Sequence, residues 1–281
     1  VVLWALGDNA AIWVDEDLPI DYYYDCDDKE GGGSALSDYE TYGFNNCDLQ
    51  TIVDIVDTNI MPNVTALLGE PSDVNGDGRV AIVISETLNF ITFQADDDDD
   101  KSEMVEAYTD PETDLEDWNE DDNKCSDEQE VIFVFAPDED ASVNPAYGPV
   151  TVDEYTGMAL AGRIVQGMVE LISYNQHVLV NESDAEESWV TKGISAVVAD
   201  LLGFGAIYYG DAWDYMDAPH LYSLTDGNED SAECGDGDTG SMDGGGEEAP
   251  PPSKTADEDS VLSTATRGPQ YLFFRWLVDA Y

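Results

Sequence analysis

The order of apolar and polar residues along this chain predicts strands early in the sequence and helices later. Apolar and polar positions alternate around Ile12-Trp13-Val14, which is typical of strands with one buried face, and a loop rich in Asp, Tyr and Gly follows. The segments 80–84 and 131–135 are short, unbroken runs of β-branched and other apolar residues. Such runs predict buried strands.

Apolar residues at helical spacing predict helices in four other segments. Asp48 is the expected N-cap of the first helix, Pro62 follows its apolar series, and Gly203 ends the third helix. The four expected helices cover residues 48–68, 151–178, 186–202 and 271–281.

Two acidic segments interrupt this pattern, and we expect both to be solvated. The segment 96–130 includes an unbroken run of aspartates from Asp96 to Asp100, and the segment 226–259 is dominated by Gly, Asp, Glu and Pro. Strands followed by helices favour an α+β architecture. We therefore expect a single domain over 1–281, in which a strand-rich lobe (1–150) with a mixed sheet packs on a helical lobe (151–281) that carries the 226–259 insertion.

The charge of the chain excludes several classes of partner. The sequence has 63 acidic and only 9 basic residues, a formal net charge of −54, beside a hydrophobic fraction of 42% that is normal for a folded core. Nucleic acids and anionic membranes need Lys and Arg that are scarce here. The charge favours adaptation to salty (halophilic) or calcium-containing surroundings, with recruitment of a cationic partner as the alternative. No stretch reaches the roughly 20 apolar residues of a membrane span.

The cysteines indicate an oxidising compartment. Cys26, Cys47, Cys125 and Cys234 are far apart and have no zinc-ligand spacing, so two disulfides are expected. Three pairings are possible, and we favour Cys26–Cys47, which closes the Tyr- and Gly-rich segment, with Cys125–Cys234 as the long-range bond. The apolar start at Val1 is typical of a processed N-terminus. We therefore expect a secreted protein, extracellular or at the cell surface, with the periplasm as a further location.

Several motifs in the second half resemble those of hyicolysin-type secreted zinc metallopeptidases. The segments are 162–176, which reads Gly-Arg-Ile-Val-Gln-Gly-Met-Val-Glu-Leu-Ile-Ser-Tyr-Asn-Gln, and 187–195, which reads Glu-Ser-Trp-Val-Thr-Lys-Gly-Ile-Ser. In that family the first helix carries His-Glu-x-x-His before an Asn-Gln run, and the second carries Trp-Leu-Asn-Glu-Gly-Leu-Ser. The resemblance extends to residues 73–84, 200–205 and 271–275 and implies a zincin-like, thermolysin-like fold.

The resemblance also implies that the zinc-binding and catalytic residues are lost. Two imidazoles one helical turn apart, a carboxylate from the next helix and a Glu base are required. At these positions the chain has Gln166 for the first His, Gly167 for the base, Glu170 for the second His and Lys192 for the third ligand. We expect Lys192 to lie within salt-bridge reach of Glu170 or another acid, where its charge would replace that of the metal.

The leading hypothesis is therefore a non-catalytic, metallopeptidase-like extracellular domain with a structural or protein-binding role, within an assembly of surface proteins. The alternative is an active secreted zinc endopeptidase whose ligands are misread or lie elsewhere. A third interpretation is a stand-alone protein adapted through its acidic surface. No cofactor is expected under the leading hypothesis, and zinc belongs only to the enzymatic alternative. The histidines, His177 and His220, are too far along the chain from this turn to replace the ligands.

Asp73, Asn75 and Asp77 are candidate calcium ligands. They occupy alternate positions before Gly78, as at the start of a calcium loop. The twelfth position is Ile84 and a strand follows, so this is not an EF-hand. The favoured interpretation is a turn whose Asp and Asn side chains bond the backbone, with calcium as the alternative.

Overall fold

The structure is a computed structural model of residues 1–281. It describes residues 1–16, 18, 20–21, 44–90, 92–94, 102–104, 106–117, 119, 123–138, 140–143, 145, 148–152, 155–221, 224–225 and 267–280. The insertion expected at 226–259 lies outside these residues, as do Asp96–Asp100, Cys26 and Cys234.

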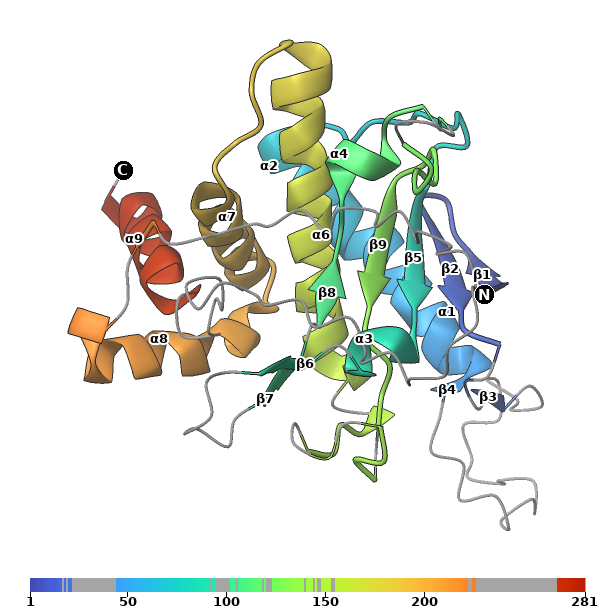
Figure 1. Ribbon diagram of the computed structural model, residues 1–281, viewed down its shortest axis with the longest axis horizontal. Helices are drawn as coiled ribbons and strands as arrows, with labels where there is room; N and C mark the ends of the chain where they lie inside the picture. Colours follow the sequence, from blue (N-terminus) through green and yellow to red (C-terminus); the bar gives the residue numbers. More distant parts are fainter. Residues whose placement is uncertain are drawn as a thin grey trace, which may run out of the picture.

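A five-stranded mixed sheet forms the centre of the molecule, which confirms the mixed sheet predicted from the sequence (Figure 1). Its three inner strands run parallel, and the strands at both edges run antiparallel to their neighbours. In spatial order the strands are β1 (Val2–Leu6), β2 (Ala10–Val14), β5 (Val80–Ile84), β9 (Val131–Val134) and β8 (Ala107–Tyr108). Two short ribbons lie outside this sheet: β3 (Ile20–Asp21) with β4 (Phe44–Asn45), and β6 (Thr92–Gln94) with β7 (Ser102–Met104).

The first predicted helix is present but begins earlier than expected. It consists of α1 (Asn46–Ile55), a π-helical turn η1 (Val56–Ile60) and α2 (Met61–Leu68). Asn45 is the N-cap, and Asp48 completes a capping box from the third helical position, so the expectation of Asp48 as N-cap was wrong. Pro62 lies at the start of α2, where a missing N–H costs little, and does not end the helix.

The remaining long helices form a layer that extends away from the sheet. Most described residues of the segments expected at 151–178, 186–202 and 271–281 are helical, and Gly203, with a φ of +93°, follows the second of these segments. Helix α6 packs against β8 and β9, α7 packs against α6, and α9 contacts both α7 and α8 (Figure 1). The elements are η2 (Tyr155–Ala159), α6 (Leu160–Tyr174), η3 (Asn175–Val180), α7 (Ser188–Leu201), η4 (Gly205–Tyr208), α8 (Tyr209–Asp217), η5 (Pro219–Leu221) and α9 (Arg267–Ala280).

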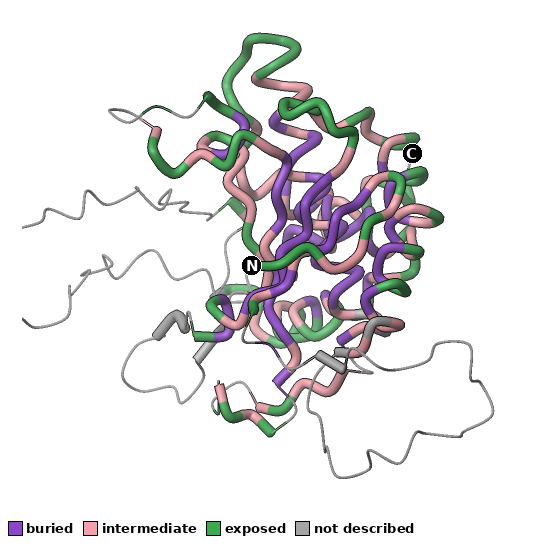
Figure 2. Tube along the Cα trace, turned by 90° about the vertical axis from the view of Figure 1, so that its right-hand side faces the viewer, coloured by how far each residue is buried: buried purple, intermediate pink, exposed green. Residues whose placement is uncertain are grey.

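The hydrophobic core joins the sheet to this helical layer. One cluster of buried side chains includes residues from Ala10 in β2 to Tyr271 in α9, and Figure 2 shows the buried part of the chain concentrated in the interior. Among the described residues, no helix is both long and apolar enough to cross a membrane.

The expectation of an exposed loop over the whole segment 96–130 was wrong for its described part. This part contains β8 and the short helix α4 (Pro111–Asp114), and Asp114, Leu115 and Glu130 are buried. The edge strand β8 pairs with β9 and brings the residues beside it against α6. Residues of the acidic segment 96–130 therefore take part in the packing between β8 and α6.

Candidate functional site

The positions at which the resemblance places the metal ligands lie on two neighbouring helices. Gln166, Gly167 and Glu170 are in α6, and Lys192 is in α7. Most of α6 is buried, but Gln166 and Glu170, one turn apart, are only partly buried. The side chains at these two positions therefore share the face of α6 that the edge strand β8 borders.

Gly167, in the same turn of α6, is in contact with the sheet. A Cβ atom at residue 167 would stand 2.6 Å from Ile132 Cγ2 and 2.9 Å from both Cγ1 and Cδ1 of Ile132. Ile132 is fully buried in β9, so its side chain has little room to move. The close approach of α6 to β9 thus depends on glycine, and a glutamate at residue 167 would collide with the sheet.

A chain of hydrogen bonds connects the polar side chains of this site. Gln166 Nε2 donates to Glu170 Oε1 at 3.1 Å, and Thr109 Oγ1, just after β8, donates to Glu170 Oε2 at 2.5 Å. Arg163 Nη1 donates to Gln166 Oε1 at 3.3 Å. The guanidinium thus donates to the amide oxygen, and the amide nitrogen donates to the carboxylate. With the bond from Thr109, both oxygens of Glu170 accept hydrogen bonds within the protein.

Two arginines meet at Glu106 next to this chain of bonds. Arg163 Nη2 forms an ion pair with Glu106 Oε2, and Arg267 Nη1 lies 3.7 Å from the same oxygen. The guanidinium of Arg163 also stands over the ring of buried Tyr208, 5.5 Å from its centroid. Burial raises the pKa of Asp211 to about 6, although Arg267 and Arg163 oppose this shift.

Of the two arrangements expected for Lys192, an ion pair with Glu170 is not found between these two described residues, and a pair with another acid stays a prediction. Both residues are described, and no ion pair within 4 Å joins them; Thr109 and Gln166 donate to Glu170 instead. The two histidines lie in other elements. His177 Nε2 is 3.4 Å from Glu186 Oε2, and His220 is in η5. Among the described residues, no three His, Cys, Asp or Glu side chains are grouped so that they could hold a metal ion.

The loop that contains the candidate calcium ligands is closed by hydrogen bonds to its own backbone. Asp73 Oδ1 accepts from Gly78 N at 2.9 Å, Asn75 Oδ1 from Asp77 N at 3.0 Å, and Asp77 Oδ1 from Arg79 N at 2.8 Å. These bonds agree with the turn interpretation.

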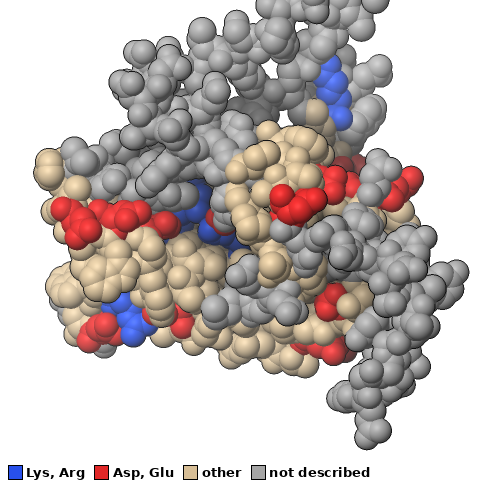
Figure 3. Space-filling model, turned by 90° about the horizontal axis from the view of Figure 1, so that it is seen from below, with Lys and Arg blue, Asp and Glu red and all other residues tan. Residues whose placement is uncertain are grey.

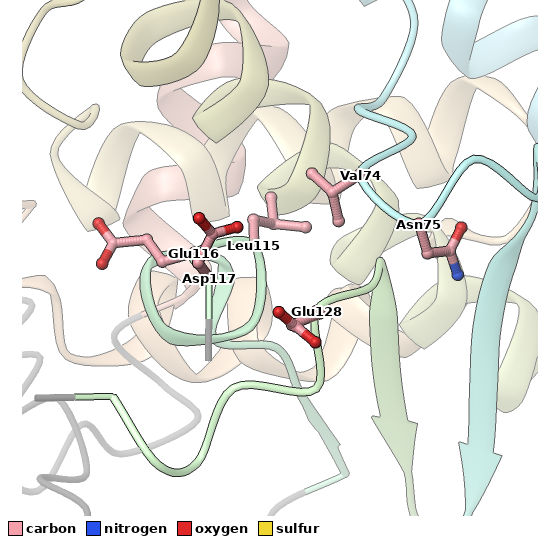
Figure 4. A pocket seen from close by; sticks show the side chains of 6 residues that line it. All are labelled: Val74, Asn75, Leu115, Glu116, Asp117 and Glu128. Atoms are coloured by element: carbon pink, nitrogen blue, oxygen red, sulfur yellow. The ribbon is translucent and has the colours of Figure 1, made fainter. Parts of the chain in front are cut away.

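A pocket of about 260 Å³ lies beside this loop. Figure 4 shows Asn75 at one end of the pocket and Glu116 at the other, with Glu128 between them. The pocket is lined by Val74, Asn75, Leu115, Glu116, Asp117 and Glu128. Its carboxylates disfavour anionic ligands.

Asp114 is a buried acid that the sequence pattern did not reveal. Burial, with the nearby carboxylates of Asp127 and Asp110, raises its pKa to about 7. The predicted site residues did not include Arg163, Glu106, Thr109, Asp211 or Asp114. Arg163 alone left a signal in the sequence, since it is one of only nine basic residues and lies on an apolar helix.

Cys47 and Cys125 are each disulfide-bonded. Their expected partners, Cys26 and Cys234, lie outside the described residues, so the pairing stays a prediction. Comparison with known proteins identifies no relative: no family model and no curated protein matches this chain.

Proposed function

We propose that this chain is a non-catalytic, metallopeptidase-like domain that binds other extracellular or surface proteins. We further propose that its mixed α and β architecture is a zincin-like fold. Motifs that resemble the hyicolysin type support it, and the helix α6 that carries Gln166 and Glu170 lies beside the antiparallel edge strand β8. Two disulfide-bonded cysteines support an extracellular location, in which disulfides persist.

The observation that carries the proposal is the state of the four replaced positions. Gly167 offers no base and is packed against Ile132, while both carboxylate oxygens of Glu170 are used by Thr109 and Gln166. A zinc ion needs several side chains whose lone pairs are free to converge on it. An amide, an occupied carboxylate and an ammonium do not supply them.

The alternative of misread residues meets a physical objection at residue 167. A glutamate there would need space that Ile132 occupies. The absence of a side chain at Gly167 thus leaves the space that the side chain of Ile132 fills, although the two residues are 35 positions apart in the sequence (167 − 132). A single reading error at residue 167 would not restore the enzyme.

The test measures zinc and peptidase activity together. We expect the native chain, dialysed in excess Mg²⁺ to remove diffusely bound cations, to retain no stoichiometric zinc and to show no chelator-sensitive cleavage of casein. The positive control combines Gln166→His, Gly167→Glu, Glu170→His and Lys192→Glu with Ile132→Ala to make room for the base. Stoichiometric zinc with chelator-sensitive cleavage by the native chain would refute the proposal and favour the enzymatic alternative.

A further inference from the structure

Helix α8 presents an apolar face to solvent although it is packed on the rest of the molecule by its other side. Tyr209, Trp213 and Met216 are 46%, 66% and 48% exposed. They are spaced at i, i+4 and i+7, so they form one stripe along the helix, about 10 Å long at 1.5 Å per residue. We call these three residues the α8 stripe. Trp213 has the highest exposure among the described large hydrophobic residues.

The stripe is held in a fixed orientation at its N-terminal end. Tyr209 Oη donates to Asp200 Oδ1 at 2.7 Å, and the Tyr209 ring lies 6.3 Å from the ring of Tyr271 in α9. Asp200 is itself fixed by Arg275, whose Nη1 is 2.5 Å from Asp200 Oδ2. An aromatic residue that is already ordered loses little conformational entropy when a partner binds.

Carboxylates border the stripe. Asp214 and Asp217 are exposed and, at helical spacing, lie along one side of it. Figure 3 shows the underside of the molecule, where α8 lies in Figure 1; on its left, uncharged surface is bordered by acidic side chains. An exposed indole beside carboxylates suits a cation that is attracted both by the ring face and by the negative charge.

We propose that the α8 stripe binds a basic, amphipathic polypeptide segment, whose apolar side chains cover Trp213 and Met216 and whose Lys or Arg side chains meet Asp214 and Asp217. Charge complementarity selects this occupant. A second copy of the chain would bring its own Asp214 and Asp217 against the same carboxylates, and anionic lipids would be repelled by a net charge of −54. A free metal ion would leave the indole uncovered.

The inference rests on the binding role proposed above but not on the loss of catalysis. The α8 stripe contains none of the four positions Gln166, Gly167, Glu170 and Lys192. Detection of zinc or peptidase activity would therefore not contradict peptide binding at the α8 stripe. Failure of peptide binding would in turn leave the non-catalytic assignment standing.

The experiment uses the full chain and a short synthetic amphipathic peptide of leucine and lysine, with calorimetry at physiological salt to measure Kd. We expect Trp213→Ala to weaken binding about tenfold, which corresponds to 1.4 kcal/mol. The matched control is Trp276→Ala, which removes another exposed tryptophan, in α9, and should change Kd less than about twofold. Asp214→Asn with Asp217→Asn should weaken binding and reduce its salt dependence.

NMR spectra of the indole N–H groups locate the bound peptide, because the six tryptophans of the chain give resonances that can be followed separately. The peptide should shift the Trp213 signal most. Equal effects of Trp213→Ala and Trp276→Ala on Kd would reduce the binding to diffuse electrostatic attraction and overturn the proposal. Equally tight binding of the peptide with glutamate in place of lysine would also overturn it, as would self-association of the chain that Trp213→Ala abolishes.

Discussion

The contact between Gly167 and Ile132 allows a quantitative prediction of how a side chain at residue 167 would change the stability of the fold. Gly167→Ala adds one methyl group inside an α-helix, which by intrinsic propensity should stabilise the fold by about 1 kcal/mol. At residue 167 the added Cβ would lie 2.6 Å from Ile132 Cγ2. Overpacking of this kind costs about 1–3 kcal/mol, so we expect a net destabilisation of up to about 2 kcal/mol.

A double-mutant cycle isolates the steric term. Ile132→Ala removes all three atoms that the new Cβ would meet, at a cost of about 2–5 kcal/mol for the cavity it leaves. In that background Gly167→Ala should become stabilising, because the clash is gone and the methyl group fills part of the cavity. The expected coupling energy between the two substitutions is about 2–4 kcal/mol.

The measurement is the free energy of unfolding from urea denaturation of the four proteins in the cycle, at constant high salt. Gly210→Ala in the first turn of α8 serves as the control, since a Cβ at residue 210 would meet no atom within 4 Å. It should stabilise the protein by at most about 1 kcal/mol. If Gly167→Ala stabilises as much as Gly210→Ala, and the cycle is additive within about 0.5 kcal/mol, the steric argument against a base at residue 167 is wrong.

Three further predictions concern charge. The melting temperature should rise steeply with NaCl, because screening relieves the repulsion within a chain of net charge −54, and each kcal/mol relieved raises it by about 2–4 °C; a flat profile from low to molar salt would contradict this. The pKa of Asp114, about 7 in the folded state, exceeds its unfolded value, so the folded state binds the extra proton and stability should fall as pH rises from about 4 to 7. Asp114→Asn should remove that fall, worth at most about 4 kcal/mol in the difference between the two pH profiles, and identical profiles would show that Asp114 ionises freely. Millimolar Ca²⁺ should raise the melting temperature beyond the effect of salt if the 73–78 loop binds calcium, and Asp77→Ala should then abolish this increment alone; an unchanged calcium response in the variant would identify the loop as an ordinary turn.

Long periodic segments allowed most of the fold to be predicted from the sequence. The strands at 80–84 and 131–134 are apolar throughout because they lie in the middle of a sheet, and the helices α6 and α7 carry wide apolar faces. Helix α8 was missed because its apolar residues face solvent, so no amphipathic pattern pointed to a core. The edge strand β8 was missed because it is only two residues long and stands in an acidic stretch.

The site could be predicted only in part, because its partners come from distant segments. Sequence spacing placed Gln166 and Glu170 on one helical face, and the structure agrees. It did not identify Thr109, which reaches Glu170 across 61 residues of sequence (170 − 109). Charge identifies residues that can attract one another, but the position of the edge strand decides which donors lie within reach of the carboxylate, and these include Thr109.

The use of scarce arginines at this site has a physical reason. Glu106 lies within the acidic segment 96–130 and is mostly buried beside β8, where an uncompensated carboxylate would be costly to desolvate. Arg163 from α6 and Arg267 from α9 both approach its Oε2 atom, although the chain has only nine basic residues. Because one carboxylate on the edge strand is thereby tied to two helices, the positive charge that holds this region together comes from side chains of the protein. A bound metal is therefore not needed to join the edge strand to α6.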